Sequence, residues 1–313
     1  MRIAIFGTGG VGGYFGARLA EAGEDVVFLA RGAHLEAIRR AGLKVVTDSG
    51  VILVHPAQAT DDPAEVGAVE AVLVCVKAWQ VSEAARAMGP MVGPDTAVCP
   101  LQNGVEAAAQ LVEVLGERPV LGGLSGTLSF ITAPGEIRSV GNTNFVKLGE
   151  RDGRTSERAR RLRDALARAG VDAEIPQDIE AATWQKFLFV TAFGGVGAVT
   201  RAPLGVIRDV PETRRLLEGC MRETHAVARA RGVALAEDGV ARGMALLETL
   251  APEGTTSLHR DIVDGKPSEL EAWSGAVVRL GAESRVPTPL HGFLYASLLP
   301  LERRARGELT FPA

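Results

Sequence analysis

The chain begins MRIAIFGTGGVG (residues 1–12), and this stretch decides the fold of its first half. A short apolar run suited to a buried parallel strand precedes the glycines, and residues 11–21 follow them with helical spacing. In such a strand, turn and helix, Gly7 permits the sharp turn, Gly9 lets the backbone approach a pyrophosphate, and Gly12 allows close helix packing. The anion then lies at the amide end of the helix. We expect a dinucleotide to contact the whole turn: Gly7, Thr8, Gly9, Gly10, Val11 and Gly12.

The residue after the second predicted strand, Asp25 to Ala30, indicates which dinucleotide is bound. NAD-binding proteins usually place Asp or Glu here to accept from the ribose 2'-hydroxyl. This chain has Arg31, and a guanidinium suits the 2'-phosphate of NADP. The sequence therefore predicts NADP(H) as cofactor, with a solvated surface charge as the alternative interpretation of Arg31.

Length and composition are those of an ordinary globular protein with room for two domains. The chain has 313 residues, 46% hydrophobic and 23% charged, and a formal net charge of -4. Its Lys and Arg residues are scattered, which argues against nucleic acid as the main partner. Cys75, Cys99 and Cys220 form no CxxC pair, so they are expected in the core of a protein kept in a reducing compartment.

Membrane and metal signals are not found in the sequence. The longest apolar run, residues 187–199, is too short to cross a bilayer and is expected to be a buried helix. The first residues have no secretory pattern, so the cytoplasm is the expected location and no membrane partner is expected. The five histidines lack ligand spacing, and we predict no metal site.

Short apolar strands alternate with helical stretches through the first half, which predicts a doubly wound parallel sheet of Rossmann type. The candidate strands are Arg2 to Phe6, Asp25 to Ala30, Ala71 to Val76, Thr96 to Pro100 and Pro119 to Leu121. Residues 43–56 predict a hairpin turning at Asp48-Ser49-Gly50. Residues 135–150 predict two strands that pair antiparallel near the sheet edge, and residues 171–175 predict a last strand.

Strand signals stop at Pro176, and the rest of the chain is predicted to be helical. The expected helices are Ile179 to Val199, Glu212 to Gly232, Ala236 to Leu250 and Ser268 to Gly281. We therefore divide the chain into an NADP-binding α/β domain, residues 1–176, and an all-helical substrate and catalytic domain, residues 177–313.

Lys186 is the leading candidate for chemistry in the second half. It precedes a nearly uncharged apolar stretch that extends through Val199. Desolvation lowers the pKa of an ammonium, which brings it closer to the range where it can give up a proton near neutral pH. The alternative is a surface lysine whose stem covers apolar neighbours.

Two further polar elements follow predicted strands of the first half. Lys77 comes after Val76, and Gln102-Asn103-Gly104 comes after the strand that ends near Pro100. Carboxyl ends of parallel strands present residues to a ligand. Lys77 and Asn103 are therefore candidate site residues, although a solvated charge and a simple turn would also explain them.

Together these motifs resemble the ketopantoate reductase family, the 2-dehydropantoate 2-reductases. The resemblance covers essentially the whole chain in the same order, and it rests on these segments: Gly7 to Gly12, Arg31, residues 76–80, residues 102–104, residues 184–187, and Ser257 with Glu269. It implies NADPH-dependent reduction of 2-dehydropantoate to pantoate, in the pathway to pantothenate and coenzyme A.

The resemblance also implies a role for each candidate residue. Lys186 is implied to be the general acid and a substrate ligand, while Lys77 and Asn103 hold cofactor and reacting centre. Ser257 is implied to contact the carboxylate of a small 2-keto acid, and Glu269 to orient hydroxyl groups. The roles of Ser257 and Glu269 each have a structural alternative. Residues 255–257 could cap a helix, and Ser268 with Glu271 fits a capping box.

Three positions depart from the family pattern. Members with ketopantoate activity typically carry asparagines where this chain has Val190, Gly194 and Gly254. Losing these amides favours, as an alternative, a more apolar 2-keto acid as substrate. Two rival functions also fit the sequence: a hydroxy-acid dehydrogenase working in the oxidative direction, and a catalytically silent NADP-binding regulator. The sequence allows a homodimer as well as a monomer.

Overall fold

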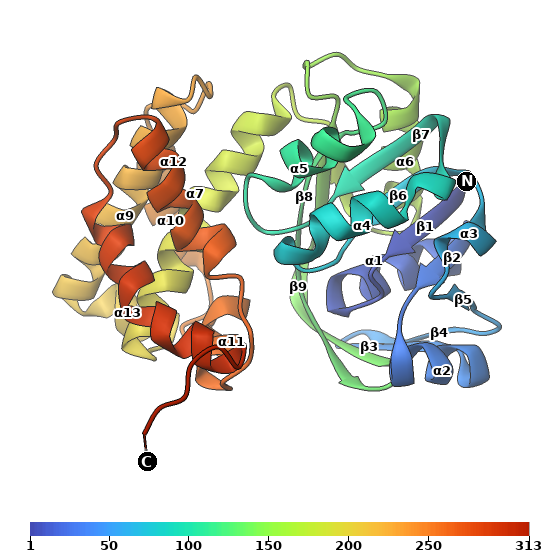
Figure 1. Cartoon of the computed structure of the whole chain (residues 1–313), viewed down its shortest axis with the longest axis horizontal. Helices are drawn as coiled ribbons and strands as arrows, with labels where there is room; N and C mark the ends of the chain where they lie inside the picture. Colours follow the sequence, from blue (N-terminus) through green and yellow to red (C-terminus); the bar gives the residue numbers. More distant parts are fainter. Residues whose placement is uncertain (313) are drawn as a thin grey trace. The chain divides into compact units, whose positions relative to one another are not determined.

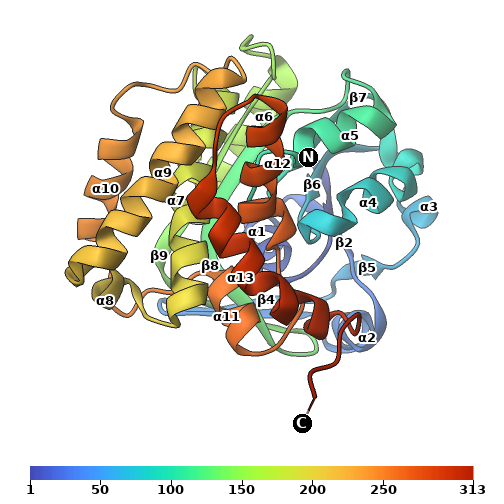
Figure 2. The same ribbon diagram turned by 60° about the vertical axis from the view of Figure 1, so that its left-hand side comes forward.

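The computed structural model describes residues 1–312, which divide into two units (Figure 1, Figure 2). Unit 1 comprises Met1–Gln102 and Glu106–Ile179, and unit 2 comprises Asn103–Val105 together with the chain from Glu180 onward. The division after Ile179 lies a few residues beyond the boundary predicted at Pro176. The short segment Asn103–Val105 belongs to unit 2, which the sequence pattern did not indicate.

A sheet of five parallel strands is the centre of unit 1, in the order β5-β2-β1-β6-β7. The strands are β1 (Arg2–Phe6), β2 (Asp25–Leu29), β5 (Gln58–Thr60), β6 (Val69–Val74) and β7 (Val92–Pro100). Phe6 pairs with Leu29 on one side and with Val74 on the other, so the carboxyl ends of the three central strands lie together. The predicted doubly wound sheet is confirmed. Of the strand predicted at residues 119–121, the structure forms only a single parallel bridge, between Val120 and Val98 of β7.

Alternate residues of β1 pack into two different cores. Ile3 and Ile5 belong to the core that α1 (Gly10–Glu21) and α6 (Glu157–Arg168) cover. Ala4 and Phe6 belong to the core beneath α4 (Val81–Ala87) and α5 (Ala107–Leu115). A parallel strand buried on both faces reads as a continuous apolar run. This explains why the first strand was readable from the sequence. The other helical segments of unit 1 are α2 (Gly32–Ala41), α3 (Pro63–Val66), η1 (Ala78–Gln80) and η2 (Gly89–Met91).

A second, mixed sheet completes unit 1. Its order is β10-β9-β3-β4, and β8 also pairs with β9. The strands are β3 (Leu43–Thr47), β4 (Gly50–Val54), β8 (Gly122–Ala133), β9 (Glu136–Gly149) and β10 (Asp172–Glu174). The expected hairpin of β3 and β4 is present.

The prediction of two antiparallel strands within residues 135–150 is wrong. They form one strand, β9, whose antiparallel partner is the unpredicted β8. Gly141, at φ 75°, has a turn-like backbone inside β9, and its N–H donates to the Asp48 carboxylate on the β3–β4 turn. The sequence around Gly141 therefore has a turn-like pattern because of a local kink within one strand, which a distant side chain fixes.

Unit 2 is helical, as predicted. Its helices are α7 (Ile179–Thr200), α8 (Leu204–Asp209), α9 (Pro211–Ala230), α10 (Gly239–Thr249), α11 (Ser257–Val263), the π-helical segment η3 (Glu271–Gly275), α12 (Ala276–Glu283) and α13 (Pro289–Ala305). α7 is buried on most of its surface, which is typical of a central helix. The single helix predicted over residues 268–281 is wrong in its first part, where a turn and η3 replace an α-helix. The sequence pattern did not reveal α8 or α13, and it indicated α11 only through the possible cap at residues 255–257.

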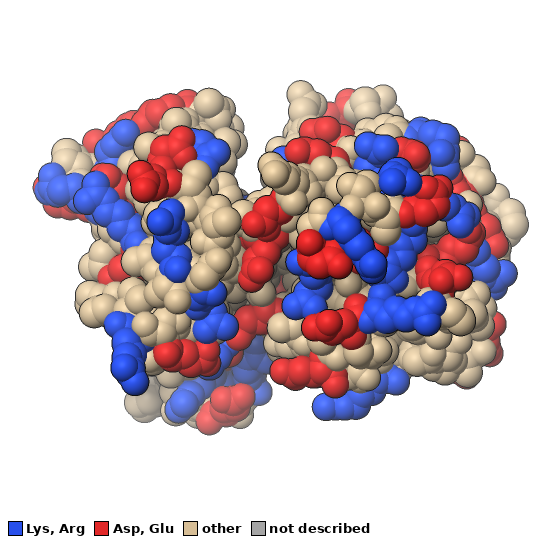
Figure 3. Space-filling view, turned by 90° about the horizontal axis from the view of Figure 1, so that it is seen from above, with Lys and Arg blue, Asp and Glu red and all other residues tan. Residues whose placement is uncertain are grey.

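Acidic and basic side chains are intermixed on the face of the molecule seen in Figure 3. Many of the charged side chains of the protein form exposed ion pairs, such as Arg138 with Asp48 and Arg214 with Glu248. In the part of the chain that the structure describes, we find no helix with the length and apolarity needed to span a bilayer.

Candidate functional site

The glycine turn of unit 1 combines structural glycines with one that faces open space. A methyl group at position 10 would lie 2.2 Å from the Ser129 carbonyl oxygen of β8, and one at position 12 would lie 2.3 Å from the Gly7 carbonyl oxygen. Gly7 itself has φ 102°, which favours glycine. A methyl group at position 9, in contrast, would meet no other atom within 4 Å. Gly9 is therefore the position of this turn where a ligand can approach the backbone.

Hydrogen bonds fix the glycine turn against the end of β2. The N–H and the hydroxyl of Thr8 both donate to the Leu29 carbonyl oxygen, each at 2.9 Å. Arg31 lies just beyond β2, at the same edge, with its side chain 69% exposed. Its Nη2 is 3.7 Å from Oε1 of Glu83, which is similarly exposed, and such a pair contributes little to stability. The Arg31 guanidinium is thus available to a ligand that binds beside the turn.

The loop after β6 lies against the glycine turn. A methyl group at position 7 would lie 2.8 Å from the Val76 backbone nitrogen. The buried Gln102 donates from Nε2 to the carbonyl oxygens of Val74 and Val76, both at 2.9 Å, so the segments after β6 and β7 are joined. Lys77 comes next, with Nζ 5.8 Å from the centre of the Trp79 ring. The structure therefore brings Lys77 to the edge that carries the turn.

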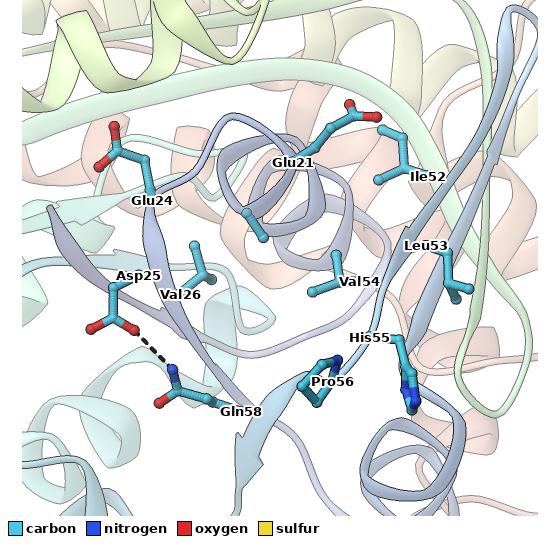
Figure 4. A pocket seen from close by; sticks show the side chains of 11 residues that line it. Glu21, Glu24, Asp25, Val26, Ile52, Leu53, Val54, His55, Pro56 and Gln58 are labelled. Atoms are coloured by element: carbon cyan, nitrogen blue, oxygen red, sulfur yellow. Dashed lines mark hydrogen bonds between the residues drawn. The ribbon is translucent and has the colours of Figure 1, made fainter.

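A cavity of about 330 Å³ lies at the opposite end of β2 in unit 1 (Figure 4). Carboxylates line it, but they have partners. Glu24 pairs with the N-terminal amine and with Arg168, and Asp25 accepts from Gln58. Because Asp25 is the first residue of β2 and Arg31 follows the last, this cavity is separate from the candidate nucleotide edge.

In unit 2, the residues next to Lys186 anchor α7 and so orient the lysine. Trp184 and Phe187 pack edge to face, with ring centres 5.7 Å apart. Gln185 donates from Nε2 to the Gly239 carbonyl oxygen at 2.9 Å, which ties α7 to the start of α10. Trp184, Gln185 and Phe187 thus hold α7 in place by packing and hydrogen bonding. Lys186 does not take part in these contacts.

Lys186 is partly buried, and two polar groups face its ammonium. Nζ donates to Oδ1 of Asn103 at 2.7 Å, and the Glu269 carboxylate acts on it electrostatically. Desolvation lowers the pKa of Lys186 from its ordinary 10.5 to about 8, while Glu269 opposes this lowering. The structure brings Asn103, Lys186 and Glu269 together, although they are far apart in the sequence. The ammonium can donate a proton near neutral pH.

Glu269 and Glu271 occupy different environments. Glu269 is only 7% exposed and lies close enough to act on Lys186. Glu271 is exposed, and its carboxylate accepts from Arg279 at 2.7 Å and from the Tyr295 hydroxyl at 2.8 Å. Glu269 is therefore the carboxylate beside the lysine.

Ser257 is the first residue of α11, and its threonine neighbours make the structural contacts there. The Thr256 hydroxyl caps the helix by accepting from the His259 N–H at 3.1 Å. The Thr255 hydroxyl accepts from Arg260 at 3.1 Å. The capping interpretation is therefore correct for Thr256, and it leaves the Ser257 hydroxyl unused in the cap.

The side of α7 that carries Lys186 continues with an apolar surface. Val190 lies one turn further on, in contact with both hydrophobic clusters of unit 2. At position 194 a methyl group would lie 2.4 Å from the buried Trp273 ring and 3.3 Å from Leu258. Trp273 therefore fills the space that a side chain at position 194 would need. Trp273 was not among the residues predicted from the sequence. The one hint in the sequence is its position, four residues after Glu269.

Comparison with known proteins gives a consistent result over nearly the whole chain. The family description "Ketopantoate reductase PanE/ApbA" matches residues 3–153, and its C-terminal counterpart matches residues 178–302. The 2-dehydropantoate 2-reductase of Mesorhizobium japonicum is 33% identical over 310 aligned residues, covering 92% of this chain and 94% of that protein.

Solved structures share the architecture. A PanE/ApbA family ketopantoate reductase from Ralstonia eutropha is 31% identical, with a TM-score of 0.89 over 98% of this chain and 100% of that one. A D-mandelate dehydrogenase, in a structure with NADH and anilino(oxo)acetate, is 19% identical with a TM-score of 0.88 over 98% and 100%, and shares the fold. The chain therefore belongs to the ketopantoate reductase PanE/ApbA family of oxidoreductases, which depend on a pyridine nucleotide.

Proposed function

We propose that this protein reduces 2-dehydropantoate to pantoate with NADPH, in the cytoplasmic pathway to pantothenate and coenzyme A, and that Lys186 is the proton donor. The observation that carries the proposal is the Lys186 environment: an ammonium 2.7 Å from Asn103, beside a buried Glu269, with a pKa near 8. The names of the relatives support the choice of substrate.

The nucleotide is assigned to the edge of unit 1. Gly9 offers open space next to backbone amides at the start of α1, which suits a pyrophosphate. Arg31 is assigned the 2'-phosphate, because its ion pair with Glu83 is long and exposed. Lys77 and Asn103 are assigned contacts with the cofactor or reacting centre. When bound, the reduced nicotinamide supplies a hydride to the ketone carbon.

Lys186 handles the charge and the proton. Negative charge develops on the ketone oxygen as the carbon is reduced, and a nearby ammonium stabilises that charge and then transfers its proton to the oxygen. The Asn103 oxygen fixes the direction of Nζ, and Glu269 helps the amine to stay protonated. Ser257 is assigned to the substrate carboxylate, as the hydroxyl near the start of α11 that the cap does not use.

A second candidate substrate is a more apolar 2-keto acid. Val190 and the Trp273-filled space at Gly194 present hydrocarbon where relatives with ketopantoate activity are expected to present amides. Such a surface offers no partner for the 4-hydroxyl of ketopantoate.

The decisive experiment compares ketopantoate with 3,3-dimethyl-2-oxobutanoate, which lacks only that hydroxyl. We would measure kcat/KM for each by the loss of nicotinamide absorbance with NADPH. A preference for ketopantoate of about tenfold or more supports the first proposal, because a site that binds the hydroxyl strongly rejects an analogue without it. A preference for the analogue supports the second. NADPH binding without turnover of any 2-keto acid would contradict both and favour a silent regulator.

A further inference from the structure

Glu302, near the end of α13, is a buried carboxylate that accepts from both donors of one residue. It is 5% exposed. The Ser268 N–H lies 3.2 Å from Oε1 and 3.0 Å from Oε2, and the Ser268 hydroxyl lies 2.5 Å from Oε2. A buried carboxylate is costly unless such donors satisfy its oxygens. Ser268 is therefore fixed to α13, which is drawn in red in Figure 2.

Arg306 completes the arrangement. Its Nε donates to Oε1 of Glu302 at 2.6 Å, and its Nη2 donates to the Ser268 carbonyl oxygen at 3.1 Å. The guanidinium balances the buried charge and occupies the one backbone group of Ser268 that the carboxylate cannot reach. We call Glu302, Arg306 and Ser268 the Glu302 clamp.

The Glu302 clamp acts on the residue just before Glu269. The Ser268 hydroxyl also accepts from the Leu270 N–H at 3.3 Å, and the Glu269 carbonyl oxygen accepts from the Trp273 N–H at 3.1 Å. The backbone is thus held on both sides of Glu269, where the chain enters η3. The backbone position from which the Glu269 side chain extends is therefore fixed.

The side chain that holds Ser268 in place comes from α13, which is distant in the sequence. A capping box within the segment would have used Glu271 to accept from the Ser268 N–H. That N–H instead donates to Glu302, 34 residues further along the chain, while Glu271 accepts from Arg279 and Tyr295. The local capping box is available in the sequence, and the structure does not use it.

We infer that the Glu302 clamp positions the Glu269 carboxylate beside Lys186, and that α13 thereby sets the pH range in which the lysine acts as an acid. The inference rests on the proposed role of Lys186 as proton donor. Glu302 acts through Ser268 and Glu269, so it is a positioning residue and not a catalytic one.

The direction of the effect follows from the groups that face Lys186. Asn103 contributes a neutral oxygen, and Glu269 contributes the negative charge that opposes desolvation. An electrostatic interaction weakens as the charges separate. If the Glu302 clamp is broken and Glu269 moves away, Lys186 loses its proton at lower pH.

The primary test is Glu302→Gln, which keeps the shape of the side chain but removes the charge that Arg306 balances. We expect kcat/KM for the 2-keto acid to fall about threefold to tenfold at about pH 8.5 and to stay within about twofold of wild type at about pH 6.5. KM for NADPH should not change. Glu302→Asp, which restores the carboxylate, should recover part of the loss.

Glu271→Gln is the matched control. It removes a carboxylate from the same segment whose partners, Arg279 and Tyr295, lie on α12 and α13. Its pH profile should be that of the wild type. If Glu302→Gln does not fold, Arg306→Gln gives the same test at a side chain that is 28% exposed.

A direct readout separates this inference from the proposed function. The chain has only five lysines, so the ¹³Cε resonance of Lys186 can be assigned by its loss in Lys186→Met and titrated without substrate. We expect Glu302→Gln and Glu269→Gln both to lower the pKa of Lys186. An unchanged pKa in Glu302→Gln, or in Glu269→Gln, would overturn the inference whether or not the protein reduces ketopantoate.

Discussion

The nucleotide edge of unit 1 and the Lys186 site of unit 2 are built in different ways. The edge is made mainly of backbone: a turn of consecutive residues whose glycines approach Val76, Ser129 and one another. The Lys186 site is made of side chains, from Asn103, α7 and the segment before η3. In the backbone site, an added methyl group at Gly7, Gly10 or Gly12 would clash with neighbouring atoms. A side-chain site is sensitive to the loss of a single functional group.

The largest effect is expected from Lys186→Met, which removes the ammonium and keeps an unbranched side chain. General acid catalysis contributes on the order of 10²- to 10⁴-fold, and kcat for 2-keto acid reduction should fall by that amount. Because the nucleotide edge is intact, the Kd of NADPH measured by fluorescence should change little. Turnover within about twofold of wild type would remove Lys186 from the mechanism.

Arg31→Asp tests the other region. An acidic residue at the end of β2 accepts from a ribose 2'-hydroxyl and repels a 2'-phosphate. The ratio of kcat/KM for NADPH to that for NADH should fall by about tenfold to a hundredfold. The fall of activity at alkaline pH, which depends on Lys186, should not change, since the substitution is confined to unit 1. A ratio equal to that of the wild type would mean that Arg31 is a surface charge.

The pH profile sharpens the description of the side-chain site. Reduction needs protonated Lys186, whose pKa is about 8 without substrate, so kcat/KM for the 2-keto acid should be level below that pH and fall about tenfold per pH unit above it. Glu269 opposes the lowering of this pKa, so Glu269→Gln should move the alkaline limb to lower pH. Oxidation of pantoate needs the neutral amine and should rise over the same range. If activity fell only near pH 10.5, the ordinary pKa of a lysine, the result would contradict a desolvated environment for Lys186.

The smallest effects come from two adjacent glycines of the backbone site. Gly10→Ala places a methyl group 2.2 Å from the Ser129 carbonyl oxygen and should destabilise the protein by about 1–3 kcal/mol. Gly9→Ala points into open space, so its Tm should match the wild type while its Kd for NADPH rises about threefold to tenfold. Thermal unfolding and a nucleotide titration of both variants make the comparison. Equal losses of Tm would mean that position 9 is structural too.

The parts of the fold that were predictable are those whose local pattern agrees with their burial. β1, β2 and the glycine turn were readable because the strands are buried on both faces and the turn needs particular residues. β8 was missed because Gly122–Ala133 is rich in small and polar residues, and its hydroxyls pair with one another and with β9. α13 was missed because Pro289 and Pro300 argue against a helix, although Pro289 stands in the first turn, where proline is tolerated.

The candidate site was predictable residue by residue but not as an arrangement. Lys186 was indicated by the apolar stretch after it, and Glu269 by the family resemblance. That Asn103 contacts Lys186, that Trp273 closes the space at Gly194, and that Glu302 reaches Ser268 all depend on contacts between segments distant in sequence. Helical periodicity carries no information about such contacts. Without α13, the Glu302 clamp could not be foreseen.

The crossing of β8 over the first turn of α1 has a consequence for how such chains can diverge. A side chain at position 10 would clash with the Ser129 carbonyl oxygen, and one at position 12 with the Gly7 carbonyl oxygen, whether or not a nucleotide is present. A descendant that abandoned its nucleotide would keep these glycines, since folding alone selects for them. Position 9 would be the first to accept a side chain. Among related chains, a residue other than glycine at position 9 should therefore mark weakened nucleotide binding while the rest of the signature persists.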